Sequence, residues 1–77
     1  MTIHTLPLGA YQTNTYILEN EGRCVIIDPG YAPDTILRFL AQRDLTADAI
    51  MLTHGHFDHV GAVEKILEAT GCRLWLS

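Results

Sequence analysis

The chain has 77 residues, of which 48% are hydrophobic and 18% charged, a composition typical of one globular domain over residues 1–77. The formal net charge of −4 and only five Lys and Arg residues argue against a nucleic-acid partner, because phosphate binding needs a basic patch. No apolar run approaches the ~20 residues that span a bilayer, which argues against a membrane partner. The N-terminus lacks the basic start and apolar core of a signal peptide, so we expect a cytoplasmic protein.

The first third of the chain predicts an antiparallel meander. Ile3–Leu8 has the apolar content of a strand, and Pro7 points to a sheet edge because proline cannot donate to the ladder. Thr15–Leu18 is rich in β-branched and aromatic residues, and Asn20-Glu21-Gly22 suits the hairpin turn that follows. Cys24–Ile27 is a continuous apolar run, typical of a central strand that is covered on both faces.

The rest of the chain alternates helix and strand, which predicts a βαβ unit and an α/β fold with a mixed sheet in the order β-β-β-α-β-α-β. Gly61 lies in the first turn of the second helix, where we expect close packing to offset the cost of a glycine. The expected elements are a helix from Pro33, a strand Ala49–Leu52, a helix Val60–Thr70 that stops at Gly71, and a strand Arg73–Leu76.

Two helices are too few to cover both faces of five strands, so the sequence reads like the first half of a larger sandwich. The final strand should present an unpaired edge or an uncovered apolar face, which favours a homo-oligomer through that edge or face. Neither Cys24 nor Cys72 lies in a C-x-x-C spacing, which favours two reduced, buried thiols over a disulfide or metal role.

A cluster of metal-ligand side chains stands where the strand Ala49–Leu52 ends and the next helix begins. His54, His56 and His59 are three of the chain's four histidines, and Asp58 lies among them. Zinc-like ions bind imidazole and carboxylate, and the absence of cysteine from the cluster favours a hydrolytic site over a structural one. His54 and His56 are two residues apart, so both rings can face one ion, while Asp58 and His59 can face a second.

Each of these residues also has a plainer interpretation. Asp58 directly precedes a helix and suits an N-cap, although capping does not explain three imidazoles beside a positive helix end. Asp28 in Asp28-Pro29-Gly30 suits a turn before proline on residue statistics alone. His4, far from the cluster in sequence, reads as an ordinary strand histidine.

The pattern His54-x-His56-x-Asp58-His59, preceded by Thr53 and an apolar strand, resembles the metallo-β-lactamase fold hydrolases. Asp28-Pro29-Gly30 at the end of the preceding strand matches a second landmark of that family. Asn14-Thr15-Tyr16 and the order of elements look most like the glyoxalase-II-like (hydroxyacylglutathione hydrolase) branch. The resemblance covers the whole chain but only the N-terminal portion of the family's αββα sandwich.

This resemblance implies a role for each matching residue. His54 and His56 match two ligands of a first metal, and Asp58 and His59 match ligands of a second, with Asp58 also orienting the nucleophilic water. Asp28 matches a buried carboxylate that supports the ligands from behind. The implied cofactor is zinc at two sites, with iron or manganese as alternatives, and the implied reaction is hydrolysis of a small-molecule thioester such as an S-acyl-glutathione through a metal-bound hydroxide.

Two alternatives remain open at this point. The family's later histidine, bridging aspartate and final histidine have no counterpart up to Ser77, which favours a catalytically incompetent half-domain that binds metal weakly or not at all. The same fold also serves iron-dependent persulfide dioxygenases. Nuclease branches fit the acidic charge poorly, and flavodiiron relatives place a glutamate where this chain has His56.

Overall fold

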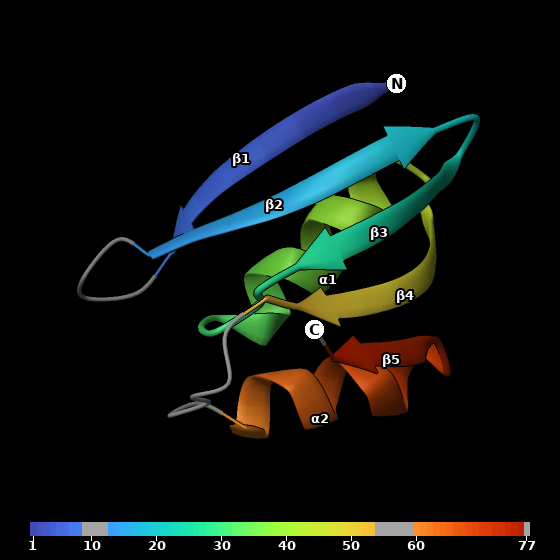
Figure 1. Ribbon diagram of the computed structural model, residues 1–77. Helices are drawn as coiled ribbons and strands as arrows, with labels where there is room; N and C mark the ends of the chain where they lie inside the picture. The colour runs from blue at the N-terminus through green and yellow to red at the C-terminus, as the bar shows by residue number, and fades with distance from the viewer. Residues whose placement is uncertain (9–12, 54–59, 77) are drawn as a thin grey trace.

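The computed structural model describes residues 1–8, 13–53 and 60–76, which form a sheet with two helices (Figure 1). The order of the elements is the one that the sequence predicts, and the α/β class is confirmed. The elements are β1 (Thr2–Leu8), β2 (Thr13–Asn20), β3 (Arg23–Ile27), α1 (Pro33–Gln42), β4 (Thr46–Leu52), α2 (Val60–Thr70) and β5 (Arg73–Leu76).

The strands lie in the sheet in chain order, β1-β2-β3-β4-β5. The pairs β1–β2 and β2–β3 are antiparallel, while β3–β4 and β4–β5 are parallel, so the sheet is mixed. β3 is the central strand and β1, which carries Pro7, is an edge strand, as the sequence predicts.

The turn between β2 and β3 lies within the predicted Asn20-Glu21-Gly22. Asn20 still pairs with Arg23 in the ladder, and the residues with positive φ are Glu21 (52°) and Gly22 (80°). Two consecutive left-handed residues make the turn whose twist matches that of a β-hairpin. The predicted hairpin is therefore confirmed, with the two-residue loop beginning after Asn20.

Both helices pack on one face of the sheet. Ile17, Ile26 and Ile50 lie directly opposite one another on β2, β3 and β4, and all three are fully buried. Ile36 of α1 and Ile66 of α2 cover them and are equally buried. Burying a side chain of this size contributes about 1.5–3 kcal/mol, so this cluster holds the helices against the sheet.

The opposite face of the sheet is open in the described part of the chain. Ile3 is 61% exposed, Tyr16 36% and Trp75 50%, and Val25 and Ile27 of the central strand are only half-buried. The described residues cover Cys24–Ile27 on the helix side alone, so the predicted coverage of its outer face is not seen among them. The predicted uncovered apolar face is present.

Local signals set the helix boundaries. Pro33 is at the start of α1 behind Ala32, which has a left-handed φ of 48°, and Asp34 lies in the first turn, where a negative charge favours the helix dipole. α2 ends at Gly71, whose φ of 66° is one that glycine adopts without strain. Neither described helix is long and apolar enough to cross a bilayer.

Gly61 bears on a further expectation. It is exposed, and a Cβ built on it meets no described atom within 4 Å. The described residues therefore show no close packing at this glycine.

Candidate functional site

The structural centre of the candidate site is Asp28, which directly follows β3. Its backbone N–H donates to the carbonyl oxygen of Met51 on β4 at 3.0 Å, and its own carbonyl accepts a hydrogen bond from the buried Thr15 hydroxyl of β2 at 3.2 Å. Asp28 has a positive φ of 54°, a conformation that aspartate tolerates better than most residues. Residues of β2 and β4 therefore both bind Asp28, the residue that directly follows β3.

The Asp28 carboxylate binds the residue that ends β4. Its Oδ1 accepts the backbone N–H of Thr53 at 2.8 Å, and its Oδ2 accepts the Thr53 hydroxyl. Charge-assisted hydrogen bonds of this kind are roughly twice as strong as neutral ones. Because Thr53 immediately precedes His54, this pair of bonds fixes where the histidine-rich segment leaves the sheet.

The predicted metal ligands His54, His56, Asp58 and His59 lie outside the described residues, and so does the predicted N-cap role of Asp58. The structure describes the two ends of their segment, which are Thr53 after β4 and the first turn of α2. Within residues 1–8, 13–53 and 60–76, no group of three or more His, Cys, Asp or Glu side chains is placed to hold a metal ion. The metal site therefore remains a prediction from the motif.

Asp28 lies at the carboxyl end of β3 and next to Thr53, the residue before His54, while its role behind the metal ligands stays a prediction. Its side chain is half-buried. The part played by Thr53 was not predicted, although Thr53 stands directly before His54 in the sequence. Nothing in the sequence indicated that a hydroxyl 25 positions away from Asp28 would bind its carboxylate.

His4 lies on β1, on the face that the helices cover. Its Nε2 is 2.7 Å from Glu19 Oε1, and its ring meets the ring of Phe39 edge-on at a centroid distance of 5.0 Å. The guanidinium group of Arg43 stacks over the Phe39 ring, with its carbon 4.8 Å from the ring centroid. These contacts fasten β1 to β2 and α1, which agrees with the interpretation of His4 as a strand histidine.

The two cysteines are both free thiols. Cys24 is buried in the core, and this burial raises the pKa of its thiol to about 11, with smaller contributions from Asp48, Cys72 and Glu19. A thiol that stays protonated at neutral pH is a poor nucleophile and a poor metal ligand. The prediction of two reduced thiols agrees with the structure, but burial was predicted for both, and Cys72 is only half-buried.

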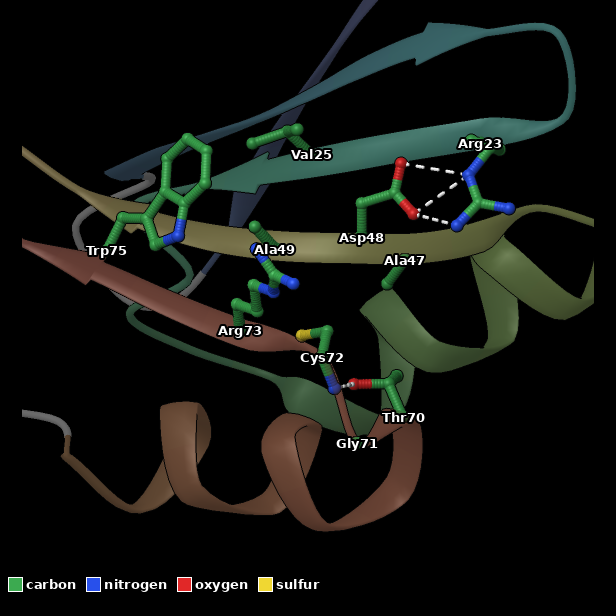
Figure 2. A pocket seen from close by; sticks show the side chains of 10 residues that line it. All are labelled: Arg23, Val25, Ala47, Asp48, Ala49, Thr70, Gly71, Cys72, Arg73 and Trp75. Carbon is green, nitrogen blue, oxygen red and sulfur yellow. Dashed lines mark hydrogen bonds and ion pairs between the residues drawn. The ribbon is translucent and has the colours of Figure 1, made fainter.

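A hollow of about 610 Å³ lies on the open face of the sheet, at the amino ends of β4 and β5 (Figure 2). At one end of it, Arg23 Nε donates to Asp48 Oδ1 at 2.9 Å and to Oδ2 at 3.0 Å, and these bonds hold the pKa of Asp48 below its ordinary value. Arg73 and Trp75 also line the hollow. Sites in open α/β sheets form outside the carboxyl ends of the strands, so this hollow is at the wrong end to belong with Asp28 and Thr53.

The chain belongs to the metallo-beta-lactamase superfamily, whose family model matches residues 8–77. It is 41% identical over 63 residues to a probable metallo-hydrolase, YqgX, of Bacillus subtilis, covering 82% of this chain and 30% of that protein. It is 36% identical over 76 residues to the hydroxyacylglutathione hydrolase GloC of Haemophilus influenzae, covering 97% of this chain and 36% of that protein. The chain thus spans about a third of the length of these relatives.

Solved structures agree with this membership. The BLEG-1 B3 metallo-beta-lactamase matches with a TM-score of 0.87 and 39% identity over 95% of this chain and 35% of its own. ETHE1 from Myxococcus xanthus matches with a TM-score of 0.83 and 31% identity, over 96% of this chain and 34% of its own. TTHA1623, solved in a di-iron-bound form, matches with a TM-score of 0.79 and 41% identity, over 92% of this chain and 36% of its own. The predicted metallo-β-lactamase-type fold is therefore confirmed, as is the likeness to hydroxyacylglutathione hydrolases.

Proposed function

We propose that this chain supplies the metal-binding front portion of a hydrolase that cleaves a small-molecule thioester such as an S-acyl-glutathione. The observation that carries the proposal is the attachment of Thr53 to Asp28, which anchors the first residue before the histidine motif at the carboxyl ends of two parallel strands. Hydroxyacylglutathione hydrolases that are 36% and 44% identical to the chain support the substrate class.

The donor set of the motif fits the implied metals. Three imidazoles and a carboxylate provide the nitrogen and oxygen ligands that zinc binds, and they also suit iron or manganese. In the proposal His54 and His56 hold a first ion, and Asp58 and His59 a second, with Asp58 also orienting the water. A bound divalent ion would lower the pKa of a water molecule toward about 7 and polarise the substrate carbonyl.

Asp28 and Thr53 would contribute to this site by fixing the position at which the ligand segment starts. A ligand segment that starts from a residue with two fixed hydrogen bonds loses less conformational freedom when it closes around a metal. The same argument gives Asp28 the role of supporting the ligands without touching the metal, as residues behind metal ligands commonly do.

The second candidate concerns the 77-residue chain by itself. In this candidate the chain is a half-domain that binds metal weakly and does not turn over substrate. The described residues add no further group of ligands to the four of the motif, and a catalytic zinc typically takes three protein ligands for one ion. An iron-dependent persulfide dioxygenase is a third candidate, and the relative solved with two irons supports iron at a site of this kind.

Metal analysis by mass spectrometry of the purified chain, followed by calorimetric titration with Zn²⁺, Fe²⁺ and Mn²⁺, separates these candidates. The proposal expects binding that His56→Ala weakens, together with a preference for zinc. A chain with no affinity for any of the three ions would contradict the metal site. Binding of iron alone would favour the dioxygenase.

A further inference from the structure

Thr15 of β2 is a polar residue in the core of the sheet. Within the described part of the chain, it is the only buried polar or charged residue, with 1% of its surface exposed. It lies two positions before Ile17, so its side chain shares the helix-covered face. A buried hydroxyl costs free energy unless it finds a hydrogen-bond partner. The partner of Thr15 is the carbonyl oxygen of Asp28, to which its hydroxyl donates at 3.2 Å.

The register of the sheet explains why this hydroxyl meets that carbonyl. The last pair of the β2–β3 ladder joins Tyr16 and Ile27. Thr15 and Asp28 come next in the same antiparallel register. β3 ends at this point, whereas β2 continues and pairs with β1 as far as Thr13. A side chain of β2 thus binds the chain where β3 leaves the sheet.

The backbone conformation of Asp28 needs support from other strands. Asp28 has a φ of 54° and directly precedes Pro29, whereas a residue before proline prefers an extended backbone with φ near about −120°. Met51 accepts the N–H of Asp28 at 3.0 Å and Thr15 donates to its carbonyl, so the peptide groups on both sides of its Cα are held. Two fixed peptide planes set the direction of the Cα–Cβ bond, which brings the carboxylate to Thr53.

We propose that Thr15 is a positioning residue for the metal site, which acts through Asp28 rather than by binding the metal. This inference rests on the proposed function, in which the segment that starts at His54 holds metal. Without the Thr15 hydroxyl, the peptide group after Asp28 is free to turn, and the carboxylate then binds Thr53 less well. The distance of 3.2 Å is long for a hydroxyl donor, so the effect should be moderate and smaller than that of losing the carboxylate.

The test compares two variants of Thr15. Thr15→Val keeps the shape of the side chain and removes the hydroxyl, whereas Thr15→Ser keeps the hydroxyl. Calorimetric titration with Zn²⁺ should find the affinity lowered about three- to tenfold in Thr15→Val and close to that of the parent in Thr15→Ser. Thr5→Val, at an exposed position of β1, is the matched control and should bind zinc like the parent. Circular dichroism checks that each variant folds.

A second background separates positioning from a general loss of stability. Asp28→Gly removes the carboxylate, but glycine adopts a φ of 54° without strain and keeps the carbonyl that Thr15 binds. When Thr15→Val is added to Asp28→Gly, the melting temperature should fall further while zinc affinity stays at the value of Asp28→Gly alone. An equal fold-loss of zinc affinity in the parent and in the Asp28→Gly background would overturn the proposal, because Thr15 would then act independently of the carboxylate.

Hydrogen exchange at the Thr53 N–H follows the same attachment in the absence of metal. This N–H donates to Asp28 Oδ1 at 2.8 Å, so its exchange should be about three- to tenfold faster in Thr15→Val and unchanged in Thr5→Val. Equal zinc affinity or equal exchange in the parent and Thr15→Val would overturn the proposal. A parent that binds no zinc, although Thr15→Val speeds the exchange, would instead contradict the proposed function, and with it any role of Thr15 at a metal.

Discussion

The carboxylate of Asp28 accepts both hydrogen bonds that Thr53 can donate, one from its backbone N–H at 2.8 Å and one from its hydroxyl. The two residues directly follow the neighbouring parallel strands β3 and β4, and His54 comes directly after Thr53. The backbone of Asp28 is held by Met51 and Thr15 at the same time. The start of the histidine segment is therefore attached to three strands through one aspartate.

Replacing Asp28 should affect stability and metal affinity together. Asp28→Ala removes both bonds to Thr53 and leaves alanine at a φ of 54°, so we expect a loss of about 2–4 kcal/mol in the free energy of unfolding. Zinc affinity should fall by about 10–100-fold, as it does when a group supporting metal ligands is lost. Urea denaturation and calorimetric titration measure the two effects.

The variants of Thr53 serve as controls for Asp28→Ala. Thr53→Ser keeps the hydroxyl and should bind zinc like the parent, whereas Thr53→Val loses only the hydroxyl bond and should lie between the parent and Asp28→Ala. Equal zinc affinity in the parent and Asp28→Ala would show that this anchor does not organise the metal site.

His56→Ala should lower zinc affinity by at least ~10–100-fold, because a ligand contributes no less than a residue that supports one. His4→Ala is the matched control. His4 pairs with Glu19 and packs on Phe39, so its loss should lower the melting temperature and leave zinc affinity unchanged. Calorimetry that gives the parent and His56→Ala the same affinity would rule out the predicted ligand pair.

Cys24 should resist alkylation until the protein unfolds. Burial raises the pKa of its thiol from 9.0 to about 11, so almost no thiolate forms between pH 7 and 9. Because the folded state favours the protonated thiol, this contribution to stability is complete below pH 9 and is lost as the pH rises toward 11. Mass spectrometry after iodoacetamide at pH 8 should find modification at Cys72 before Cys24, and the order should vanish in urea.

The sequence predicted most of the fold because its hydrophobic periodicity and the positions of its prolines and glycines indicate the same elements. Pro7 placed β1 at the edge, and the helical spacing before Gly71 gave α2 the bounds Val60–Thr70 that the structure has. The start of β4 was missed, since Thr46 to Asp48 look like a polar loop. They are strand because Thr46 and Ala47 pair with Arg23 and Cys24 of the neighbouring strand, a pairing between residues 23 positions apart that no local pattern reveals.

For the candidate site, the sequence pointed to the ligand types and, by resemblance, to Asp28 behind them, but not to the bonds that join Asp28 to Thr53. The motif His54 to His59 stands out because metal chemistry restricts which side chains serve as ligands. The bonds from Thr53 to Asp28 depend on the parallel register of β3 and β4, which the sequence alone does not fix. A similar limit holds for Gly61, because a glycine in a helix can reflect close packing or nothing at all, and only the surroundings decide.

Gly61→Ala should stabilise the protein. The glycine is helical and exposed, and a Cβ there meets no described atom, so alanine gains helix propensity without a clash. We expect a gain of about 0.5–1 kcal/mol in the free energy of unfolding, which raises the melting temperature by about 2–8 °C in a domain of this size. Thermal denaturation followed by circular dichroism measures the shift. A lower melting temperature would reinstate the close-packing explanation.

The purified 77-residue chain should show thioesterase activity near background. The proposed motif gives each of two ions only two ligands, so a bound ion would be loosely held and its water poorly placed. A misplacement of about 1 Å can cost on the order of 100-fold in rate. The assay is hydrolysis of S-lactoylglutathione by zinc-loaded chain, with His56→Ala as the blank. Turnover in the ordinary enzyme range of roughly 1–10³ s⁻¹, absent from the blank, would refute the half-domain reading, and it would do so most directly if light scattering showed the active species to be a monomer.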